Sequence, residues 1–180
     1  MKTRVIAITG TPGTGKTALA KALARKLGYS YVDVSVLIKT HRLADSYDRK
    51  SKCFIVDAKK LCAFLRQWMR QKDNALAKGF VIDSHLSHEL PKKSVDLCIV
   101  TACGLRELSN RLRKRKYSTQ KIRENLDAEI FRTCQTEAQE KGHILLTIDT
   151  TQPLNINAVA RKVRWRLTRR QKSLTESSRL

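Results

Sequence analysis

Residues 10–17 read Gly-Thr-Pro-Gly-Thr-Gly-Lys-Thr, and this octet matches the phosphate-binding pattern G-x-x-x-x-G-K-[ST] at Gly10, Gly15, Lys16 and Thr17. The preceding run at 5–8 is Val-Ile-Ala-Ile, which predicts a short buried parallel strand. The following ten residues are rich in helix formers, and Gly28 then marks a helix end. Strand, glycine loop and helix in this order favour a phosphate-binding P-loop over a fortuitous glycine turn.

The residue types in the octet suit the chemistry of a nucleotide site. Glycines let backbone N–H groups approach phosphate oxygens, and the helix N-terminus adds partial positive charge there. Lys16 is expected to bridge the β- and γ-phosphates, and the Thr17 hydroxyl is expected to ligate Mg²⁺. The sequence therefore predicts ATP and Mg²⁺ as cofactors.

Strand and helix patterns alternate along the chain, which predicts an α/β protein with a five-stranded parallel sheet in three layers. The expected strands are Arg4–Thr9, Tyr29–Val34, Phe80–Asp83, Val95–Thr101 and Ile144–Ile148. The expected helices are Lys16–Leu27, Val56 to about Ala77, Leu105–Lys114, Thr119–Lys141 and Asn155–Gln171. Asp57 is expected to cap the second helix, whose stripe at 61, 64, 65, 68 and 69 is read as core.

The 180 residues suggest a single domain over 1–172, followed by a disordered tail at 173–180. No apolar run approaches a membrane span, and the N-terminus does not resemble a signal peptide, so a cytoplasmic protein is expected, or a nuclear one in a eukaryote. The five cysteines form no C-x-x-C pair, and Cys62 and Cys98 are read as buried apolar residues.

The net charge of +21 exceeds what a small-molecule enzyme requires, and it indicates proximity to RNA. A generally basic proteome or a requirement for solubility is the alternative. The last expected helix combines an apolar seam with many basic residues around Trp165. Its basic face fits contact with phosphates, a solvated amphipathic surface or, less well, a membrane surface.

A P-loop site needs a carboxylate near the metal, and an adjacent strand ends at Asp83. Asp83 is therefore the candidate for holding Mg²⁺ through water. His85 follows two residues later and is a candidate for orienting an attacking water or contacting a phosphate. In the alternative reading, Asp83 caps the next turn and His85 is an exposed loop residue.

Three stretches together resemble the archaeal and nuclear-type adenylate kinase family. They are the octet, the segment Val81-Ile-Asp-Ser-His-Leu-Ser-His88, and the stretch from Arg111 to Ile130, which includes Arg115-Lys-Tyr-Ser118 and Glu124-Asn-Leu-Asp-Ala-Glu-Ile130. The resemblance covers 4 to about 163, and the second and third stretches are more specific than the octet.

The resemblance implies a P-loop nucleoside-monophosphate-kinase fold with a short lid at about 114–124 and a monophosphate-binding segment at about 33–56. It implies a broad-specificity adenylate kinase, ATP + AMP = 2 ADP, that also hydrolyses ATP and acts in late maturation of the small ribosomal subunit. The implied partners are AMP and ADP, a platform ribosomal protein and pre-ribosomal RNA, with no membrane and a monomer or weak complex. The alternative is mainly an ATPase assembly factor that chaperones the ribosomal protein, with negligible kinase flux.

The resemblance also assigns residues. It places Gly13, Gly15, Lys16, Thr17 and the Ala18 backbone on the ATP-binding loop, Arg115 on the lid arginine, and Lys39 where an arginine often holds the monophosphate. The chain departs from the family pattern at two further points. Lys116 replaces the usual glycine in the lid, and Gln152 replaces a lysine that contacts ATP in some relatives.

Overall fold

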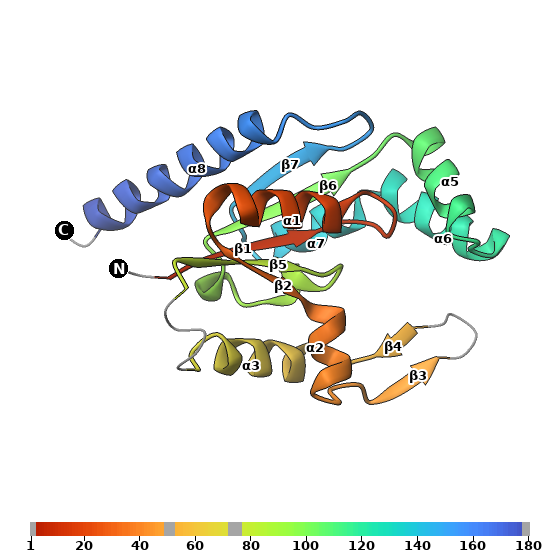
Figure 1. Ribbon diagram of the computed structural model, residues 1–180, viewed down its shortest axis with the longest axis horizontal. Coiled ribbons are helices and arrows are strands. Elements are labelled where there is room, and N and C mark those ends of the chain that lie inside the picture. Colours follow the sequence, from red (N-terminus) through yellow and green to blue (C-terminus); the bar gives the residue numbers. More distant parts are fainter. Residues whose placement is uncertain (1–2, 49–52, 72–76, 178–180) are drawn as a thin grey trace.

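The computed structural model describes residues 3–48, 53–71 and 77–177. Its centre is a parallel sheet of five strands in the order β2-β5-β1-β6-β7 (Figure 1). The strands are β1 (Arg4–Thr9), β2 (Ser30–Asp33), β5 (Gly79–Asp83), β6 (Leu97–Ala102) and β7 (Leu145–Asp149). The predicted α/β class, the five strands and the parallel pairing are confirmed.

Helices cover both faces of the sheet. Helices α1 (Lys16–Leu27) and α8 (Ile156–Ser177) cover one face, and α3 (Ala58–Trp68) and α7 (Thr133–Glu140) cover the other. Side chains alternate along a strand, so Ile6 and Ile8 of β1 pack under α1 while Val5 and Ala7 pack on the opposite side. The predicted three-layer arrangement is thereby confirmed.

The remaining elements gather at the carboxyl end of the sheet, where the loop after β1 also lies (Figure 1). On one side are α5 (Leu105–Lys114) and α6 (Thr119–Ile130), which share a small apolar cluster. On the other side are α2 (Val34–Thr40) and a hairpin of β3 (Ser46–Asp48) and β4 (Cys53–Ile55). Sequence patterns did not predict this hairpin, because its strands are too short to show alternation.

The single helix expected over Thr119–Lys141 is instead two helices, α6 and α7. The break lies at Phe131 and Arg132, where Arg132 adopts the left-handed conformation with φ 51°. No glycine or proline marks this break in the sequence. The turn lets Ala138 of α7 reach the core below the sheet while α6 stays with α5.

Two other helix ends differ from the sequence prediction. Helix α3 ends at Trp68, with Met69 as its C-cap, rather than near Ala77; the predicted end falls next to 72–76, outside the described residues. Helix α8 continues to Ser177, so part of the tail predicted to be disordered is helical. Its last residues contain no glycine or proline that would end it earlier.

The predicted cap and core positions agree with the structure. The Asp57 carboxylate accepts a hydrogen bond from the Lys60 N–H at 2.9 Å and caps α3. Cys62 and Cys98 are buried, as expected of small apolar residues. Among the described residues, no helix is both long enough and apolar enough to cross a bilayer.

Candidate active site

The phosphate loop, residues 10–17, is fixed to the sheet by buried threonine side chains. Thr14 Oγ1 lies 2.6 Å from Thr101 Oγ1 on β6 and donates to the Thr11 carbonyl at 2.7 Å. Thr150, just after β7, donates to the Thr14 carbonyl at 2.5 Å. These bonds satisfy buried polar groups of the loop and hold its shape against the sheet.

Two glycines are required by the packing around the loop. Gly10 has φ +138°, and a Cβ there would overlap Thr101. Gly13 has φ +96°, and a Cβ there would lie 2.8 Å from Leu108 Cδ1 of α5. The phosphate loop and α5 are thus in direct contact, and any side chain at Gly13 would separate them.

Lys16 folds back over the phosphate loop. Its ammonium donates to the carbonyls of Gly10 at 2.7 Å and Thr11 at 3.0 Å. Burial lowers the pKa of Lys16 to about 8, because the charged form loses water. A phosphate group placed at the loop would replace these carbonyls as the partner of the ammonium and restore its ordinary pKa.

Asp83 stands at the end of β5 with its carboxylate held by a neighbouring strand. The Tyr31 hydroxyl on β2 donates to Asp83 Oδ2 at 3.0 Å, and it also lies 3.3 Å from Asp33 Oδ2. Burial and the Asp83 carboxylate raise the pKa of Tyr31, so the phenol keeps its proton and remains a donor. Tyr31 therefore fixes the orientation of Asp83.

His85 is exposed in the turn that follows β5 and lies in the same cleft as Lys16. Loss of water on the protein side of the ring and the nearby Lys16 charge lower the pKa of His85. A neutral imidazole at neutral pH is able to accept a proton or orient a water molecule.

His88, left without a role by the sequence, is buried and joins three parts of the fold. Its Nδ1 lies 2.7 Å from Thr9 Oγ1, at the end of β1, and its Nε2 lies 3.0 Å from Glu137 Oε2 on α7. Thr9 Oγ1 also donates to the His85 carbonyl at 3.1 Å. His88 thereby holds the turn that carries His85 against the strand that carries the phosphate loop.

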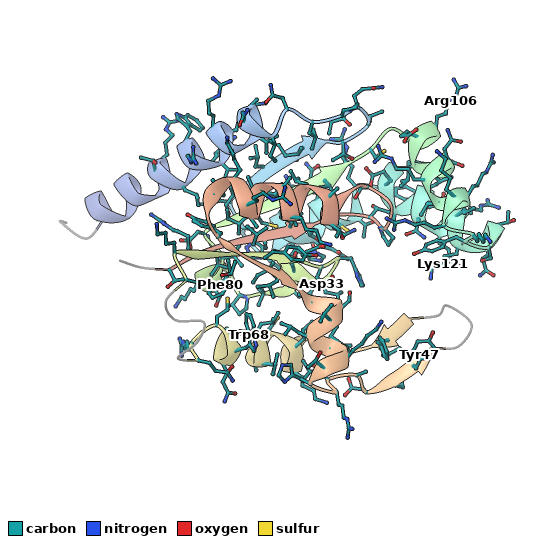
Figure 2. All side chains as sticks on the ribbon, in the orientation of Figure 1. Asp33, Tyr47, Trp68, Phe80, Arg106 and Lys121 are labelled. Atoms are coloured by element: carbon teal, nitrogen blue, oxygen red, sulfur yellow. The ribbon has the colours of Figure 1, made fainter. Side chains whose placement is uncertain are left out.

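The main cleft, of about 890 Å³, brings most of the predicted site residues together. It is lined by residues of the phosphate loop, the end of β5, the start of α2 and the segment predicted to be a lid. The predicted residues that line it are Gly13, Gly15, Lys16, Thr17, Ala18, Asp83, His85 and Arg115. Asp33 and Lys121 both line this cleft; Figure 2 labels Asp33 near the centre of the view and Lys121, on α6, at its right.

A side cleft of about 860 Å³ lies on the other flank of the phosphate loop. Gly13, Gly15, Ala18 and Arg115 line both clefts, so the loop forms the ridge between them. The outer wall of the side cleft is the segment from Thr150 to Leu154, which includes Gln152. Two cavities joined at one phosphate loop offer room for two ligands on either side of a phosphate chain.

Two predicted residues lie away from the main cleft. Lys39, at the end of α2, places its ammonium 5.8 Å from the Phe54 ring of the hairpin and does not line the cleft. Gly10 lines a separate rear cavity of about 500 Å³ beside Cys134 and Glu129. The structure therefore does not bring Lys39 together with the other predicted residues.

The donor set fits Mg²⁺. Thr17 and Asp83 offer hard oxygen ligands on the same cleft, and the described residues form no cluster of three or more metal-binding side chains. Mg²⁺ bound with nucleotides uses one or two protein oxygens, with water and phosphates completing the shell. Thr17 and Asp83 are therefore the residues that would hold it.

Sequence reasoning missed Arg111, Thr101 and Thr150. Arg111 on α5 donates to the Thr150 carbonyl at 2.7 Å and to Glu107 at 2.8 Å, which ties α5 to the wall of the side cleft. The Arg111–Glu107 spacing of four residues was visible in the sequence, but the contact with Thr150 depends on tertiary structure.

The fold and this site define a nucleotide kinase of the P-loop class. A solved shikimate kinase from Acinetobacter baumannii in complex with shikimate superposes with a TM-score of 0.62 over 90% of this chain and 91% of that one, at 14% identity, which speaks for the fold alone. The AAA domain family model matches residues 6–132.

The relatives narrow the class further. An "Adenylate kinase isoenzyme 6 homolog" of Dictyostelium discoideum is 36% identical over 148 residues, 81% of each chain. A "Putative adenylate kinase" of Methanocaldococcus jannaschii is 36% identical over 146 residues, 81% of this chain and 76% of that one. The chain belongs to this family of adenylate kinase isoenzyme 6 homologs and archaeal adenylate kinase-like proteins.

Proposed function

We propose that the chain catalyses reversible phosphoryl transfer between ATP and AMP, with broad acceptor tolerance, and that it also hydrolyses ATP. The observation that carries the proposal is the phosphate loop standing between two clefts, with Arg115 lining both and Lys16 lining the main cleft. ATP would place its base in the side cleft and its phosphates on the loop. The acceptor would enter the main cleft from the side of Asp33 and the hairpin.

Each residue then has a physical role. The loop N–H groups and Lys16 would orient the phosphates and neutralise charge, and Arg115 would add charge from the lid. Asp83, oriented by Tyr31, and Thr17 would hold Mg²⁺, which supplies further charge neutralisation on the phosphates. Closure of the lid over the main cleft would exclude water when a monophosphate is the acceptor.

A second candidate is an ATPase assembly factor with negligible kinase flux, acting in the cytoplasm or nucleus on a platform ribosomal protein and pre-ribosomal RNA. Two observations favour it. His85 is exposed on the main cleft and is neutral at neutral pH, which suits the positioning of water. The net charge of +21 suits a partner rich in RNA.

The two candidates differ in the fate of the γ-phosphoryl group. ADP and free phosphate are measured together, with and without AMP, for the wild type and for Lys16→Ala. The first candidate predicts two ADP per AMP consumed, so that AMP raises ADP formation well above the release of free phosphate. One free phosphate per ADP, unchanged by AMP, supports the second candidate. Lys16→Ala is expected to lose at least about 1,000-fold of either activity.

Lys26→Ala is the matched control, because Lys26 is exposed at the far end of the same helix. It is expected to keep its activity. Full activity in Lys16→Ala, or no turnover of MgATP by the wild type under any of these conditions, would overturn both candidates.

A further inference from the structure

Helix α8 presents a basic face to solvent beyond what its packing requires. Its apolar residues Val159, Ala160, Val163 and Leu167 are buried against the sheet. The exposed positions carry basic side chains: Arg161, Lys162, Arg164, Arg166 and Arg169. Exposed Arg25 and Lys26 at the end of α1 extend this surface, since the Arg164 guanidinium donates to the Lys26 carbonyl at 3.2 Å.

Trp165 occupies the centre of this basic face. It is two residues from both Val163 and Leu167, so at about 100° per residue it points away from the buried stripe. Its side chain is 52% exposed, and the guanidinium carbons of Arg169 and Arg166 lie 4.7 Å and 5.5 Å from its ring centroid. About half of Trp165 faces solvent and arginines of the same helix contact its ring, so core packing does not account for it.

The charges on this face are not neutralised within the described part of the protein. None of its ion pairs involves a residue of α8, and no acidic residue occurs between 156 and 169. Concentrated like charge works against the folded state unless a polyanion relieves it.

The combination of basic side chains and an exposed aromatic ring indicates which kind of partner fits this face of α8. A membrane-surface helix buries a wide apolar face in lipid, but the apolar stripe of α8 is already covered by the sheet. Single-stranded nucleic acid pairs phosphates with basic side chains and stacks bases on aromatic rings and guanidinium planes. Arg161 and Arg169 flank Trp165 one turn away on either side, about 12 Å apart along the helix.

We propose that the basic face of α8, centred on Trp165, is a binding site for single-stranded nucleic acid. Arginine and lysine side chains contact the phosphates, and Trp165 stacks on a base. The site lies apart from the nucleotide clefts, because α8 runs away from the end of the sheet that carries the phosphate loop (Figure 1). It gives a location to the RNA partner of the second candidate function and does not require phosphoryl transfer.

Binding of labelled oligo-uridine and oligo-deoxythymidine to the full chain is measured by fluorescence anisotropy over a range of salt concentrations. Trp165→Ala is expected to weaken binding about tenfold. The pair Arg161→Gln and Arg169→Gln is expected to weaken it about tenfold, and to reduce the slope of log affinity against log salt by about 1.4.

The matched control is the pair Arg106→Gln and Arg113→Gln on α5, which removes the same charge at the opposite end of the molecule from the C-terminus (Figure 2 labels Arg106). It is expected to change affinity less than about twofold. Equal weakening by the control pair would mean diffuse attraction and overturn the proposal.

Binding to phosphatidylserine vesicles or to poly-glutamate that exceeds binding to both oligonucleotides would also overturn it. The relative affinities of oligo-uridine and oligo-deoxythymidine distinguish an RNA site from a DNA site. ATP binding and turnover are measured on the same variants. Lost oligonucleotide binding with intact turnover separates this site from the clefts, and wild-type failure to bind either oligonucleotide refutes this inference while leaving the nucleotide chemistry standing.

Discussion

The phosphate loop and the β3–β4 hairpin are built differently. On the proposed donor side, the phosphate loop is anchored by buried side chains of Thr14, Thr101 and Thr150. On the proposed acceptor side, the hairpin lies outside the lining of the main cleft and exposes Tyr47, Phe54 and Ile55 (Figure 2 labels Tyr47). The donor side is therefore preorganised for phosphates, whereas the acceptor side leaves apolar surface open to groups of different shape.

This contrast bears on selectivity. A site that holds polar groups in fixed positions to hydrogen-bond its ligand discriminates strongly, because a wrong ligand leaves those groups without partners. Tyr47 and Phe54 form an exposed aromatic pair with ring centroids 5.2 Å apart. Such a pair would contact bases of different identity about equally well. We therefore expect tight constraints on the phosphate donor and looser ones on the acceptor.

The largest expected effect tests whether a carboxylate charge on the proposed donor side contributes more to phosphoryl transfer than one on the proposed acceptor side. Asp83→Asn is expected to lower phosphoryl transfer about 100-fold or more, and to raise the Mg²⁺ concentration needed for half-maximal rate. Asp33→Asn removes the same charge from the acceptor side, and asparagine caps α2 as well as aspartate does. It is expected to change kcat within about threefold.

The measurement is a Mg²⁺ titration of ADP formation for both variants. Equal losses in Asp83→Asn and Asp33→Asn would remove the asymmetry between the two sides.

The second prediction concerns the contact between the phosphate loop and α5. Gly13→Ala is expected to destabilise the protein by about 3 kcal/mol, because it adds overlap with Leu108 to the cost of φ +96°. Gly28→Ala adds only the cost of placing alanine in a left-handed backbone conformation, since nothing lies within 4 Å of the added Cβ. It is expected to destabilise the protein by about 1 kcal/mol. Urea unfolding measures both, and a Gly13→Ala cost no larger than that of Gly28→Ala would show that α5 moves away freely.

The sequence predicts best the parts of the protein that carry a strong local pattern, such as the phosphate loop and the elements on either side of it. Helix α1 and strand β1 lie where the sequence places them, because a dense local pattern of glycine, helix formers and β-branched residues specifies them. The grouping of Lys16, Asp83 and His85 also followed from the rule that parallel strands deliver their carboxyl ends to one edge.

The features that the sequence did not predict have no local sequence pattern that marks them. The turn at Phe131 and Arg132 contains neither glycine nor proline, and its cause is the separate packing of α6 and α7. The anchoring by Thr101 and Thr150 joins residues far apart in the chain. The position of Lys39 depends on the hairpin, whose short strands no periodicity revealed.

The third prediction uses the ionisation of Lys16 to probe the donor side. The free protein holds Lys16 with a pKa of about 8, and bound phosphates favour the charged form and raise that pKa. Above pH 8 the Lys16 amine must therefore take up a proton when ATP binds, so affinity falls as pH rises. With a bound-state pKa near 10 or above, the expected loss between pH 7 and pH 9 is about tenfold.

Titration with a fluorescent ATP analogue across this range checks the loss, and Lys16→Arg serves as the control because arginine does not titrate there. A wild-type affinity that stays flat from pH 7 to pH 9 would contradict the lowered pKa.

The smallest effect concerns the lid. Lys116, which follows α5 at the beginning of the lid, has φ 55°, a conformation that glycine adopts without strain. Lys116→Gly is therefore expected to stabilise the protein by up to about 1 kcal/mol, even though glycine increases the entropy of the unfolded chain. Lys114→Gly, at the last position of α5, is the matched control and is expected to cost up to about 1 kcal/mol.

Opposite signs for these two neighbouring substitutions, measured by urea unfolding, would locate strain at the base of the lid. Two destabilising substitutions of similar size would show that the left-handed backbone at Lys116 costs little. Because α5 packs on the phosphate loop at Gly13, strain relieved at Lys116 would act between that fixed loop and the segment predicted to be a lid.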